Sequence, residues 1–407
     1  MTSDSWLVIS AITNHGSATA SDELRSSHGR APGAILDRII SFRALTAILS
    51  TTVAAGCVLA QATLPEAASP ATCRGLVTDI EERRATSMAW HELIDRRERL
   101  AMAESCTAVG PAVYAEPRRN DAVTHDTVDE LAILSWNVHV GGGDIVGIVN
   151  ALRSGELTGG EPVRNFVVLL QEAFRTGATV PRTPAGVSIP RRIEAFPPNG
   201  RRQDIVQTAR ALGLGVFYVP SMRNGAGEDA TAEDRGNAIL STLPLVNFAG
   251  IELPFERQRR IAAAATVTGI DSAGNPWHLR LVSAHLNATA SVRRLWVFSA
   301  GVRGRQARRL ATVLSSEDVP IVMGSDLNSW AGGASEPAFT ELLPHFPQTS
   351  IPVGQSTFRG GRMLDYMFLR VPSVWASEVR TIDSFFGSDH RPLISWIHLR
   401  KGEARKG

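Results

Sequence analysis

Lysine is almost absent from this sequence of 407 residues, which contains it only at Lys401 and Lys406. Arginine therefore carries nearly all of the positive charge, and its planar guanidinium group suits the recognition of phosphate and carboxylate. A GC-rich genome, which favours arginine codons, would produce the same bias. The formal net charge is only +2, which excludes a uniformly polycationic protein. No run of lysines marks a pocket for an inositol polyphosphate.

Cysteine is also scarce, and the three residues form no CxxC pair that would indicate a zinc-thiolate site. If Cys57 is lost with a leader, Cys73 and Cys106 remain, and two cysteines in an exported protein suggest one disulfide. The segment Leu76–Ala103 predicts a helix, which would span roughly 40 Å if straight. A disulfide needs Cα atoms within ~7 Å, so the segment would have to fold back near Thr86–Ala89. Two free thiols on an unbroken helix are the alternative.

Long apolar runs are missing except for one near the N-terminus. Residues 1–43 are polar and aperiodic, which predicts a disordered leader. Arg38 and Arg43 precede an apolar run at residues 44–62, which ends in Ala60, Gln61 and Ala62. A positive flank, a short apolar stretch and small residues are typical of a secretory signal peptide. The prediction is cleavage after Ala62 and export, with a lipoprotein or an uncleaved membrane anchor as alternatives.

The remaining chain divides where its composition changes. Residues 63–107 predict a helical extension, and residues 108–129, with glycine and proline, predict a linker. Residues 130–400 alternate short apolar runs with polar loops and predict the main domain, and residues 401–407 are a basic tail. Strands are predicted at residues 131–136, 166–170, 216–219, 238–240, 263–268, 278–283, 321–323, 363–369, 374–379 and 393–397, and helices at residues 203–212, 304–315 and 337–343. This alternation favours an α/β fold, and the closely spaced runs at residues 363–379 favour antiparallel pairing as well.

Polar side chains follow four of these predicted strands or precede the last one. They are Asn137 and His139, Gln171 and Glu172, His285 and Asn287, Asp326 and Asn328, and the run Ser388, Asp389 and His390. Asp365 lies inside an apolar strand, where a carboxylate is costly unless it is paired. Each residue alone is explained as a turn former or a structural histidine. Together they offer oxygen ligands for Mg²⁺, Mn²⁺ or Ca²⁺ and histidines beside carboxylates for acid–base chemistry.

The strings that contain these residues are SWNVH, LLQEAF, SAHLN, GSDLN, LDYMF and SDHRPL. In this order they resemble the endonuclease/exonuclease/phosphatase superfamily, which includes DNase-I-like nucleases, neutral sphingomyelinases and inositol polyphosphate phosphatases. The resemblance covers about Leu131 to Leu399. It implies a four-layer α/β sandwich of two mixed β-sheets flanked by helices, here with a small N-terminal helical extension.

The resemblance implies a role for each matching position. Glu172 looks like the principal metal ligand, with Asn137 at the metal or the phosphate and Asp389 as a second carboxylate of the metal site. Asp326 and Asn328 match the acid and the amide of the GDxN motif. The acid of that motif orients or deprotonates the attacking water, and the amide holds phosphate oxygens.

Two histidines complete the implied set. Asp365 resembles the acid that orients His390, and His390 and His285 are assigned jointly to contact the phosphate and to move a proton. The sequence departs from apurinic-type repair nucleases, which carry aspartate at the position of His139 and tyrosine at that of His285. Both differences argue against a base-excision repair enzyme. Whether His139 contacts substrate or metal, or is structural, stays open.

The sequence defines the substrate less well than it defines the candidate site residues. Arg235 and Asn237 belong to an RGNAILS string of a kind found near the site in this superfamily, so they are candidates for substrate binding. The arginine-rich stretch from Arg293 to Arg309 could follow a nucleic-acid strand, meet anionic lipid headgroups or form a solvated helix face. Arg257, Arg259 and Arg260 form a smaller basic cluster with the same ambiguity.

The predicted function is that of an exported, divalent-metal-dependent phosphoesterase that hydrolyses phosphodiester bonds by in-line attack of water. Nuclease-like activity is preferred, since no long apolar hairpin for membrane insertion is evident. The alternatives are a sphingomyelinase-like phospholipid phosphodiesterase or a phosphatase, and a non-catalytic binding module with the same fold. The expected partner is a phosphodiester substrate, either nucleic acid or a phospholipid headgroup, and no obligate protein partner is predicted.

Overall fold

The computed structural model describes residues 73–78, 87–118, 127–182, 201–225, 232–256, 258–288, 296–329, 335–349, 356–375 and 379–399, with the backbone alone at 296–299. The predicted leader, the apolar run at 44–62 with its cleavage site, and the tail at 401–407 lie outside these residues. Within the described part, no helix is both long and apolar enough to cross a membrane.

Two β-sheets form the framework of the described part. The first has eight strands in the spatial order β1 (Leu76–Thr78), β3 (Ala112–Ala115), β6 (Gly215–Arg223), β7 (Glu233–Ser241), β5 (Phe166–Thr176), β4 (Glu130–Asn137), β14 (Leu393–His398) and β13 (Arg380–Thr381). The second has six strands in the order β12 (Asp365–Arg370), β11 (Ile321–Asp326), β10 (Pro276–His285), β9 (Ile261–Ile270), β8 (Leu245–Glu252) and β2 (Ala89–His91). Both sheets are mixed, since β4 and β5 are parallel, as are β10 and β11, whereas most other neighbours are antiparallel.

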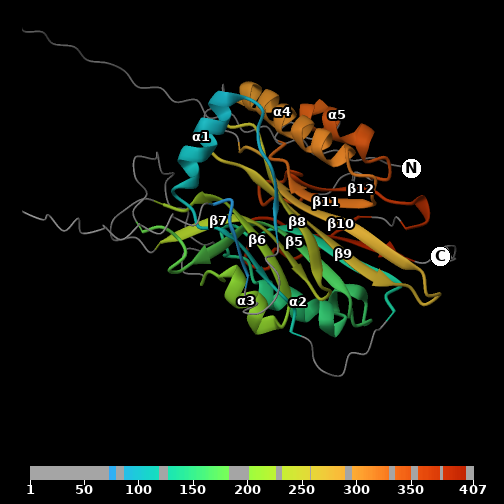
Figure 1. Cartoon of the computed structure of the whole chain (residues 1–407). Coiled ribbons are helices and arrows are strands. Elements are labelled where there is room, and N and C mark those ends of the chain that lie inside the picture. Colours follow the sequence, from blue (N-terminus) through green and yellow to red (C-terminus); the bar gives the residue numbers. More distant parts are fainter. Residues whose placement is uncertain are drawn as a thin grey trace, which may run out of the picture. The chain divides into compact units, whose positions relative to one another are not determined.

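Helices cover the outer face of each sheet, as Figure 1 shows. The helices α2 (Ile145–Ser154) and α3 (Ile205–Leu212) share an apolar core with β4, β5 and β6. The helices α4 (Trp296–Ser315) and α5 (Pro337–Leu342) share another with β10, β11 and β12. A third core lies between the two sheets and contains residues of both. The predicted four-layer sandwich of two mixed sheets flanked by helices is therefore confirmed.

Local sequence signals explain where several elements begin and end. The helix α3 begins after Asp204, whose carboxylate accepts hydrogen bonds from the backbone N–H groups of Val206 and Gln207. It ends at Gly213, which has φ 69°, a left-handed conformation that glycine adopts without steric cost. The alanine run of β9 is buried on both faces, as expected for a strand between a helical layer and another sheet.

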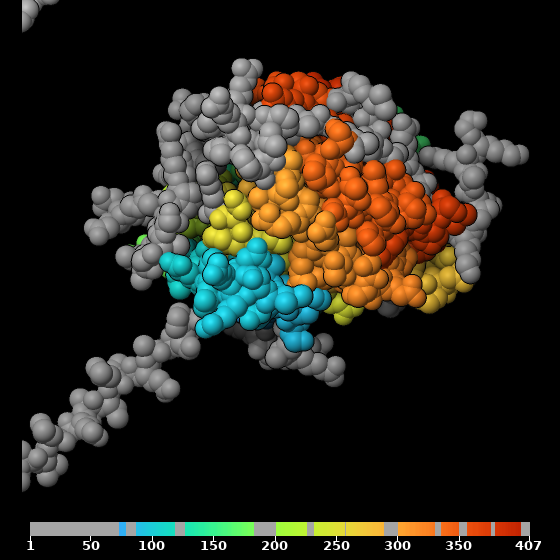
Figure 2. Space-filling model, turned by 90° about the horizontal axis from the view of Figure 1, so that it is seen from above, coloured from blue at the N-terminus to red at the C-terminus, as the bar shows by residue number. Residues whose placement is uncertain are grey.

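The N-terminal extension differs from its prediction. Instead of one helical segment over Leu76–Ala103, it forms the strands β1 and β2 and the helix α1 (Arg96–Cys106), and β3 lies inside the predicted linker. The helical prediction is wrong for these two short segments because each pairs with a strand at the edge of a sheet, β1 with β3 and β2 with β8. Such pairing overrides a weak local preference for helix. The extension therefore belongs to both sheets, and Figure 2 shows its surface in cyan beside that of α4.

A disulfide joins Cys73 to Cys106, with their Cα atoms 5.3 Å apart. The fold-back needed for it occurs through the β1 and β2 strands and α1, not through a helical hairpin. Of the turn proposed near Thr86–Ala89, Thr86 lies outside the described residues, and Ala89 begins β2.

Three further differences concern the main domain. Residues 373–375, predicted as part of a strand, form the 3-10 helix η4 (Ser373–Trp375), and β12 and β13 lie in different sheets, so the antiparallel pair predicted there does not form. The elements β8 and α2 were not predicted, and α4 begins at Trp296 rather than at Gly304. Glycine at Gly301 and Gly304 lowers local helix preference, but Gly304 packs closely against Pro337 of α5. Two more 3-10 helices, η1 (Glu156–Thr158) and η3 (Leu343–His345), follow α2 and α5.

Replacement of both bridged cysteines, Cys73→Ser with Cys106→Ser, should lower the free energy of unfolding by about 3 kcal/mol, because the bridge closes a loop with a sequence separation of 33 residues. Urea unfolding followed by tryptophan fluorescence measures this change. A reductant should destabilise the wild-type protein by a similar amount and leave the double variant unaffected. Equal stability of the wild type and the double variant in the absence of reductant would contradict the expectation.

Candidate active site

Asp326 occupies the centre of a row of polar residues in the six-stranded sheet. It ends β11, where the register pairs it with His285 at the end of β10 and with Asp365 at the start of β12. Three residues far apart in the chain therefore become direct neighbours across three strands. All three side chains are buried, so their mutual contacts decide their charges.

A hydrogen bond joins this row to the eight-stranded sheet. Nδ2 of Asn137, at the end of β4, donates to Oδ2 of Asp326 over 2.8 Å. The two residues are 3% and 1% exposed. Nearby, Nε2 of Gln171 on β5 donates to Oγ of Ser283 on β10 over 3.2 Å. The candidate site therefore lies where the strand ends of the two sheets meet.

Glu172 is presented to this site by a β-bulge. The register between β5 and β7 shifts between Leu170 and Ala173, and Glu172 has φ 52°, a left-handed conformation that costs a residue with a side chain about 1 kcal/mol or more. Its carboxylate lies 3.7 Å from Nη1 of Arg235 and 3.9 Å from Nδ1 of His285. Neither contact is short enough for a hydrogen bond, so the carboxylate oxygens keep lone pairs that could bind a cation.

Backbone strain is concentrated around the site. Of the six non-glycine residues with positive φ in the described part, His139, Val140, Glu172 and Asn328 belong to segments that carry predicted site residues. Such conformations persist only where the surrounding structure holds them, and they cluster at functional sites.

His390 is held by a carboxylate. Its Nδ1 lies 2.7 Å from Oδ2 of Asp365, and its backbone N–H donates to Oγ of Ser388, which in turn donates to the backbone carbonyl of Asn137. Burial by itself would lower the pKa of His390. The charge and hydrogen bond of Asp365, with Asp326 and Asp389 nearby, instead raise the pKa to about 10, so the imidazole is positively charged at neutral pH.

Asp326 lies between the two histidines. Its Oδ2 is 3.4 Å from Nε2 of His285 and 3.9 Å from Nε2 of His390, and its Oδ1 accepts the backbone N–H of Asn328 over 2.8 Å. Burial and the neighbouring charge of Asp365 raise the pKa of Asp326 to about 7. The carboxyl group can therefore gain or lose a proton near neutral pH.

His285 has the opposite character. Nδ2 of Asn328 donates to the carbonyl of Leu286 over 3.2 Å, and the same nitrogen lies 2.8 Å from Nε2 of His285. Nε2 therefore accepts, and the ring proton is on Nδ1, which faces Glu172. Burial, followed by the positive charges of Arg260, His390 and Arg235, lowers the pKa of His285 well below its ordinary value. His285 is neutral where His390 is charged.

Asp389 and His139 form the other border of the site. Nδ1 of His139 lies 3.0 Å from Oδ2 of Asp389, and Oδ1 of Asp389 lies 3.9 Å from Nε2 of His390. Burial opposes ionisation of Asp389, but the hydrogen bond from His139 and the charge of His390 lower its pKa below the usual range. The contact with Asp389 allows His139 to position that carboxylate.

Two sets of residues could hold a metal ion. The ligand atoms of Asp326, Asp365 and His390 lie within 4.8 Å of one another. However, the 2.7 Å contact between Asp365 and His390 occupies one of these atoms with a charge-assisted hydrogen bond, which favours an acid–base pair. The sequence-predicted set of Glu172, Asn137 and Asp389 has the oxygen donors that suit Mg²⁺, Mn²⁺ or Ca²⁺. Glu172 contacts the central cluster at His285, and Asp389 contacts it at His390.

Two buried arginines lie beside Glu172 and His285. Arg235 and Arg260 line a small pocket together with Asn237 and Ser221. The structure thus places the predicted residues Arg235 and Asn237 at the site, although Nδ2 of Asn237 donates to the carbonyl of Ile261 and so supports the backbone. Arg260 was not predicted as a site residue. Its only sequence signal is the basic cluster with Arg257 and Arg259, and Arg257 lies outside the described residues.

The arginine-rich stretch before and within α4 does not form a free basic face in its described part. Arg303 pairs with Glu336, Arg305 with Glu256 and Arg308 with Glu341, and Arg309 donates to the carbonyl of Glu92. Arg293 and Arg294 lie outside the described residues. The four described arginines therefore make structural contacts.

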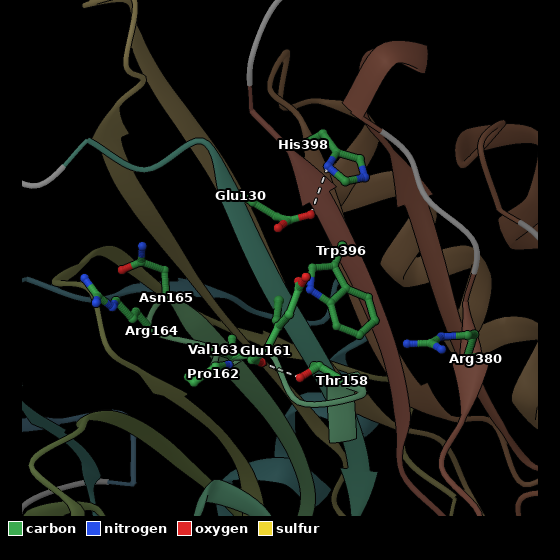
Figure 3. A pocket seen from close by; sticks show the side chains of 11 residues that line it. Glu130, Thr158, Glu161, Pro162, Val163, Arg164, Asn165, Arg380, Trp396 and His398 are labelled. Carbon is green, nitrogen blue, oxygen red and sulfur yellow. Dashed lines mark hydrogen bonds and ion pairs between the residues drawn. The ribbon is translucent and has the colours of Figure 1, made fainter. Parts of the chain in front are cut away.

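A larger pocket, of about 520 Å³, lies elsewhere (Figure 3). Trp396, Arg380 and Arg164 line it, and in Figure 3 Glu130 and His398 face each other across an ion pair of 3.1 Å. Glu130 and Asn137 are at opposite ends of β4, which places the pocket roughly 20 Å from the candidate site along the strand. It contains none of the predicted site residues.

Substitution Asp365→Asn should lower the pKa of His390 well below 10, because it removes the nearest negative charge and leaves burial as the main influence. An NMR titration of the imidazole groups in EDTA measures this change. The chemical shifts of the His398 ring, at the distant end of β14, should be the same in both proteins at any one pH. An unchanged midpoint for His390 would contradict the assigned pairing.

Comparison with known proteins gives a match to one family model and to solved structures. The model of the Endonuclease/Exonuclease/phosphatase family matches residues 134–390, and no curated protein matches. An endonuclease/exonuclease/phosphatase from Beutenbergia cavernae is 18% identical, with 67% of this chain and 72% of that chain covered and a TM-score of 0.45. The human Nocturnin catalytic domain is 17% identical, with coverages of 67% and 96% and a TM-score of 0.40. A 3′ phosphatase from Neisseria is 15% identical, with coverages of 65% and 98% and a TM-score of 0.38.

The family model covers more than half of the chain and includes Asn137, Glu172, His285, Asp326 and His390, the residues that the two sheets gather at one site. The chain therefore belongs to the Endonuclease/Exonuclease/phosphatase family, and its fold is that of a phosphoesterase.

Proposed function

We propose that this protein is an exported, divalent-metal-dependent phosphodiesterase with nuclease-like activity, which hydrolyses its substrate by in-line attack of water. The observation that carries the proposal is the position of Asp326, which lies within 4 Å of a neutral and of a charged imidazole. Membership of a phosphoesterase family supports the reaction class. A binding module would not need groups whose pKa values are so strongly separated.

The three central groups divide the chemistry among them. Asp326, with a pKa of about 7, accepts the proton of the attacking water, since a general base works best when its pKa is near the working pH. His390, charged and oriented by Asp365, stabilises negative charge on the phosphoryl group and supplies a proton to the leaving oxygen. His285 stays neutral and keeps its Nδ1–H directed to Glu172.

The contacts of Asn328 support a role in orienting His285 rather than the phosphate-binding role that the family resemblance implies. An amide nitrogen has two N–H donors, and here one meets the carbonyl of Leu286 and the other meets Nε2 of His285. With both donors used, Asn328 orients His285 and has no N–H left for a phosphate oxygen.

Glu172, Asn137 and Asp389 would hold the divalent cation. The carboxylate of Glu172, whose contacts with Arg235 and His285 are too long for hydrogen bonds, and the lowered pKa of Asp389 fit a hard cation. When bound, such an ion neutralises charge that develops on the phosphoryl oxygens.

Export is supported by the disulfide between Cys73 and Cys106, because disulfides persist in oxidising compartments and are rare in the cytosol. The N-terminal signal remains a proposal from the sequence.

The proposal is tested with plasmid DNA, RNA, sphingomyelin and bis-p-nitrophenyl phosphate, each with Mg²⁺, Mn²⁺, Ca²⁺ or EDTA. We expect cleavage of nucleic acid and of the model diester, loss of activity in EDTA, and a loss of at least about a hundredfold in kcat for His390→Ala, since a positioned acid contributes that much or more. Glu172→Ala should also lower the affinity for Mg²⁺ measured by calorimetry.

The matched controls are His398→Ala and Glu341→Ala, an imidazole and a carboxylate remote from the site. Both should retain full activity, and circular dichroism should show that all four variants are folded. Activity that survives EDTA would exclude the metal-dependent mechanism, and preference for sphingomyelin would select the lipid alternative.

A further inference from the structure

Arg235 and Arg260 carry buried N–H donors that no described residue accepts. Each residue is 4% exposed. Within the described part of the chain, Nε and Nη1 of Arg235 and Nε of Arg260 are buried and have no hydrogen-bond partner. A buried donor without a partner destabilises the folded protein, and more so when it is charged. Such groups are rare in folded proteins and call for a functional explanation.

The charge around the two guanidinium groups is also unbalanced. Arg235 has one carboxylate nearby, that of Glu172 at 3.7 Å. Burial and the proximity of Arg235 lower the pKa of Arg260 to about 10, a value at which it is still charged at neutral pH. Two cations share the region with the carboxylate of Glu172, which the proposed function assigns to a metal ion. The charge of Asp326 also acts on Arg260, but Asp326 shares that charge with the protonated imidazole of His390. The region therefore favours a bound anion.

Contacts on both sides fix Arg260 in this place. The preceding residue, Arg259, is buried, with Nη1 donating to the carbonyl of Pro220 over 2.7 Å and Nη2 lying 3.2 Å from Sγ of Cys73. The following residue, Ile261, begins β9. The disulfide of the N-terminal extension thus helps to anchor the segment that carries Arg260, and the guanidinium group is preorganised beside the reaction centre.

The space between the arginines is narrow. The pocket that Arg235 and Arg260 line together with Glu172 and His285 has a volume of about 10 Å³, which is room for about one water-sized group. A nucleobase, a sugar or an acyl chain does not fit there. A single oxygen atom of a tetrahedral oxyanion does.

We propose that Arg235 and Arg260 form an arginine recess that binds one non-bridging oxygen of the substrate phosphate. The N–H donors of Asn328 are engaged by Leu286 and His285, so another group has to bind this phosphate oxygen. A guanidinium group suits it, since its donors match the geometry of phosphate oxygens. That the bound anion is the phosphate of the substrate rests on the proposed function. That the recess binds an anion does not.

Binding of inorganic phosphate to the full-length protein, measured by isothermal titration calorimetry in EDTA and again with Mg²⁺, tests the recess without requiring turnover. Arg260→Gln and Arg235→Gln should each weaken phosphate binding at least about tenfold, because a charge-assisted hydrogen bond contributes that much or more. Arg308→Gln, which removes an arginine paired with Glu341 far from the recess, should leave the affinity unchanged.

Charge-conserving variants distinguish loss of the recess from loss of the fold. Arg260→Lys and Arg235→Lys keep the buried charge but lose the planar set of donors, so each should be folded by circular dichroism and bind phosphate several-fold more weakly. Unchanged affinity in all four recess variants would overturn the proposal. So would a wild-type protein that binds no phosphate either in EDTA or with Mg²⁺.

Kinetics with bis-p-nitrophenyl phosphate separate this proposal from the one on which it builds. In an active enzyme, Arg260→Gln should lower kcat/KM at least about tenfold, the same factor as its loss of phosphate affinity, whereas Arg308→Gln should match the wild type. An inactive wild type whose phosphate binding is lost in Arg260→Gln would refute the proposed function and support the recess. An active enzyme whose kcat/KM and phosphate affinity are insensitive to both arginines would refute the recess alone.

Discussion

The hydrogen bond from Asn137 to Asp326 is the contact on which the site depends. It joins the end of β4 in one sheet to the end of β11 in the other over 2.8 Å. Asp326 in turn has His285 and Asp365 as its neighbours in the six-stranded sheet, and Asn137 is linked through Ser388 to the segment of His390. Because both partners are buried, the bond is formed in a region of low polarity, where an unpaired carboxylate would be costly. The two sheets are therefore held in the arrangement that brings the catalytic candidates together.

Environment, and not residue type, distinguishes the two histidines. His390 faces Asp365, Asp326 and Asp389, whose charges outweigh its burial and keep it protonated. His285 is equally buried but faces Arg260 and Arg235, and it is kept neutral. A charged and a neutral imidazole on either side of one carboxylate provide a proton donor and an oriented neutral group within a single cleft. Pairs of like residues with separated pKa values are a common property of acid–base sites.

The N-terminal extension lies before the family match yet takes part in the fold of the domain. Its strands β1 and β2 complete an edge of each sheet, which protects those edges from pairing with another chain. Its disulfide contacts Arg259, the neighbour of Arg260. The extension is thus connected through the contact between Cys73 and Arg259 to the segment that carries Arg260. This connection gives it a structural reason to be present beside a domain that the family model describes without it.

The sequence by itself determined the family, the layered fold and most of the site, since Asn137, Glu172, His285, Asp326, Asp365 and His390 follow or begin strongly apolar strands whose ends meet when the sheets form. Elements that depend on distant partners were missed or wrong: β1 and β2 exist because sheet edges pair with them, and the stretch at residues 373–375 lies outside both sheets. Only the tertiary structure decided that Asn328 uses both N–H donors on His285 and Leu286, and that Nε of Arg260 is buried without a partner among the described residues. The reason is physical: a strand end is specified by its own neighbours in the chain, whereas the burial and the hydrogen-bond partners of a side chain are set by residues far away in the sequence.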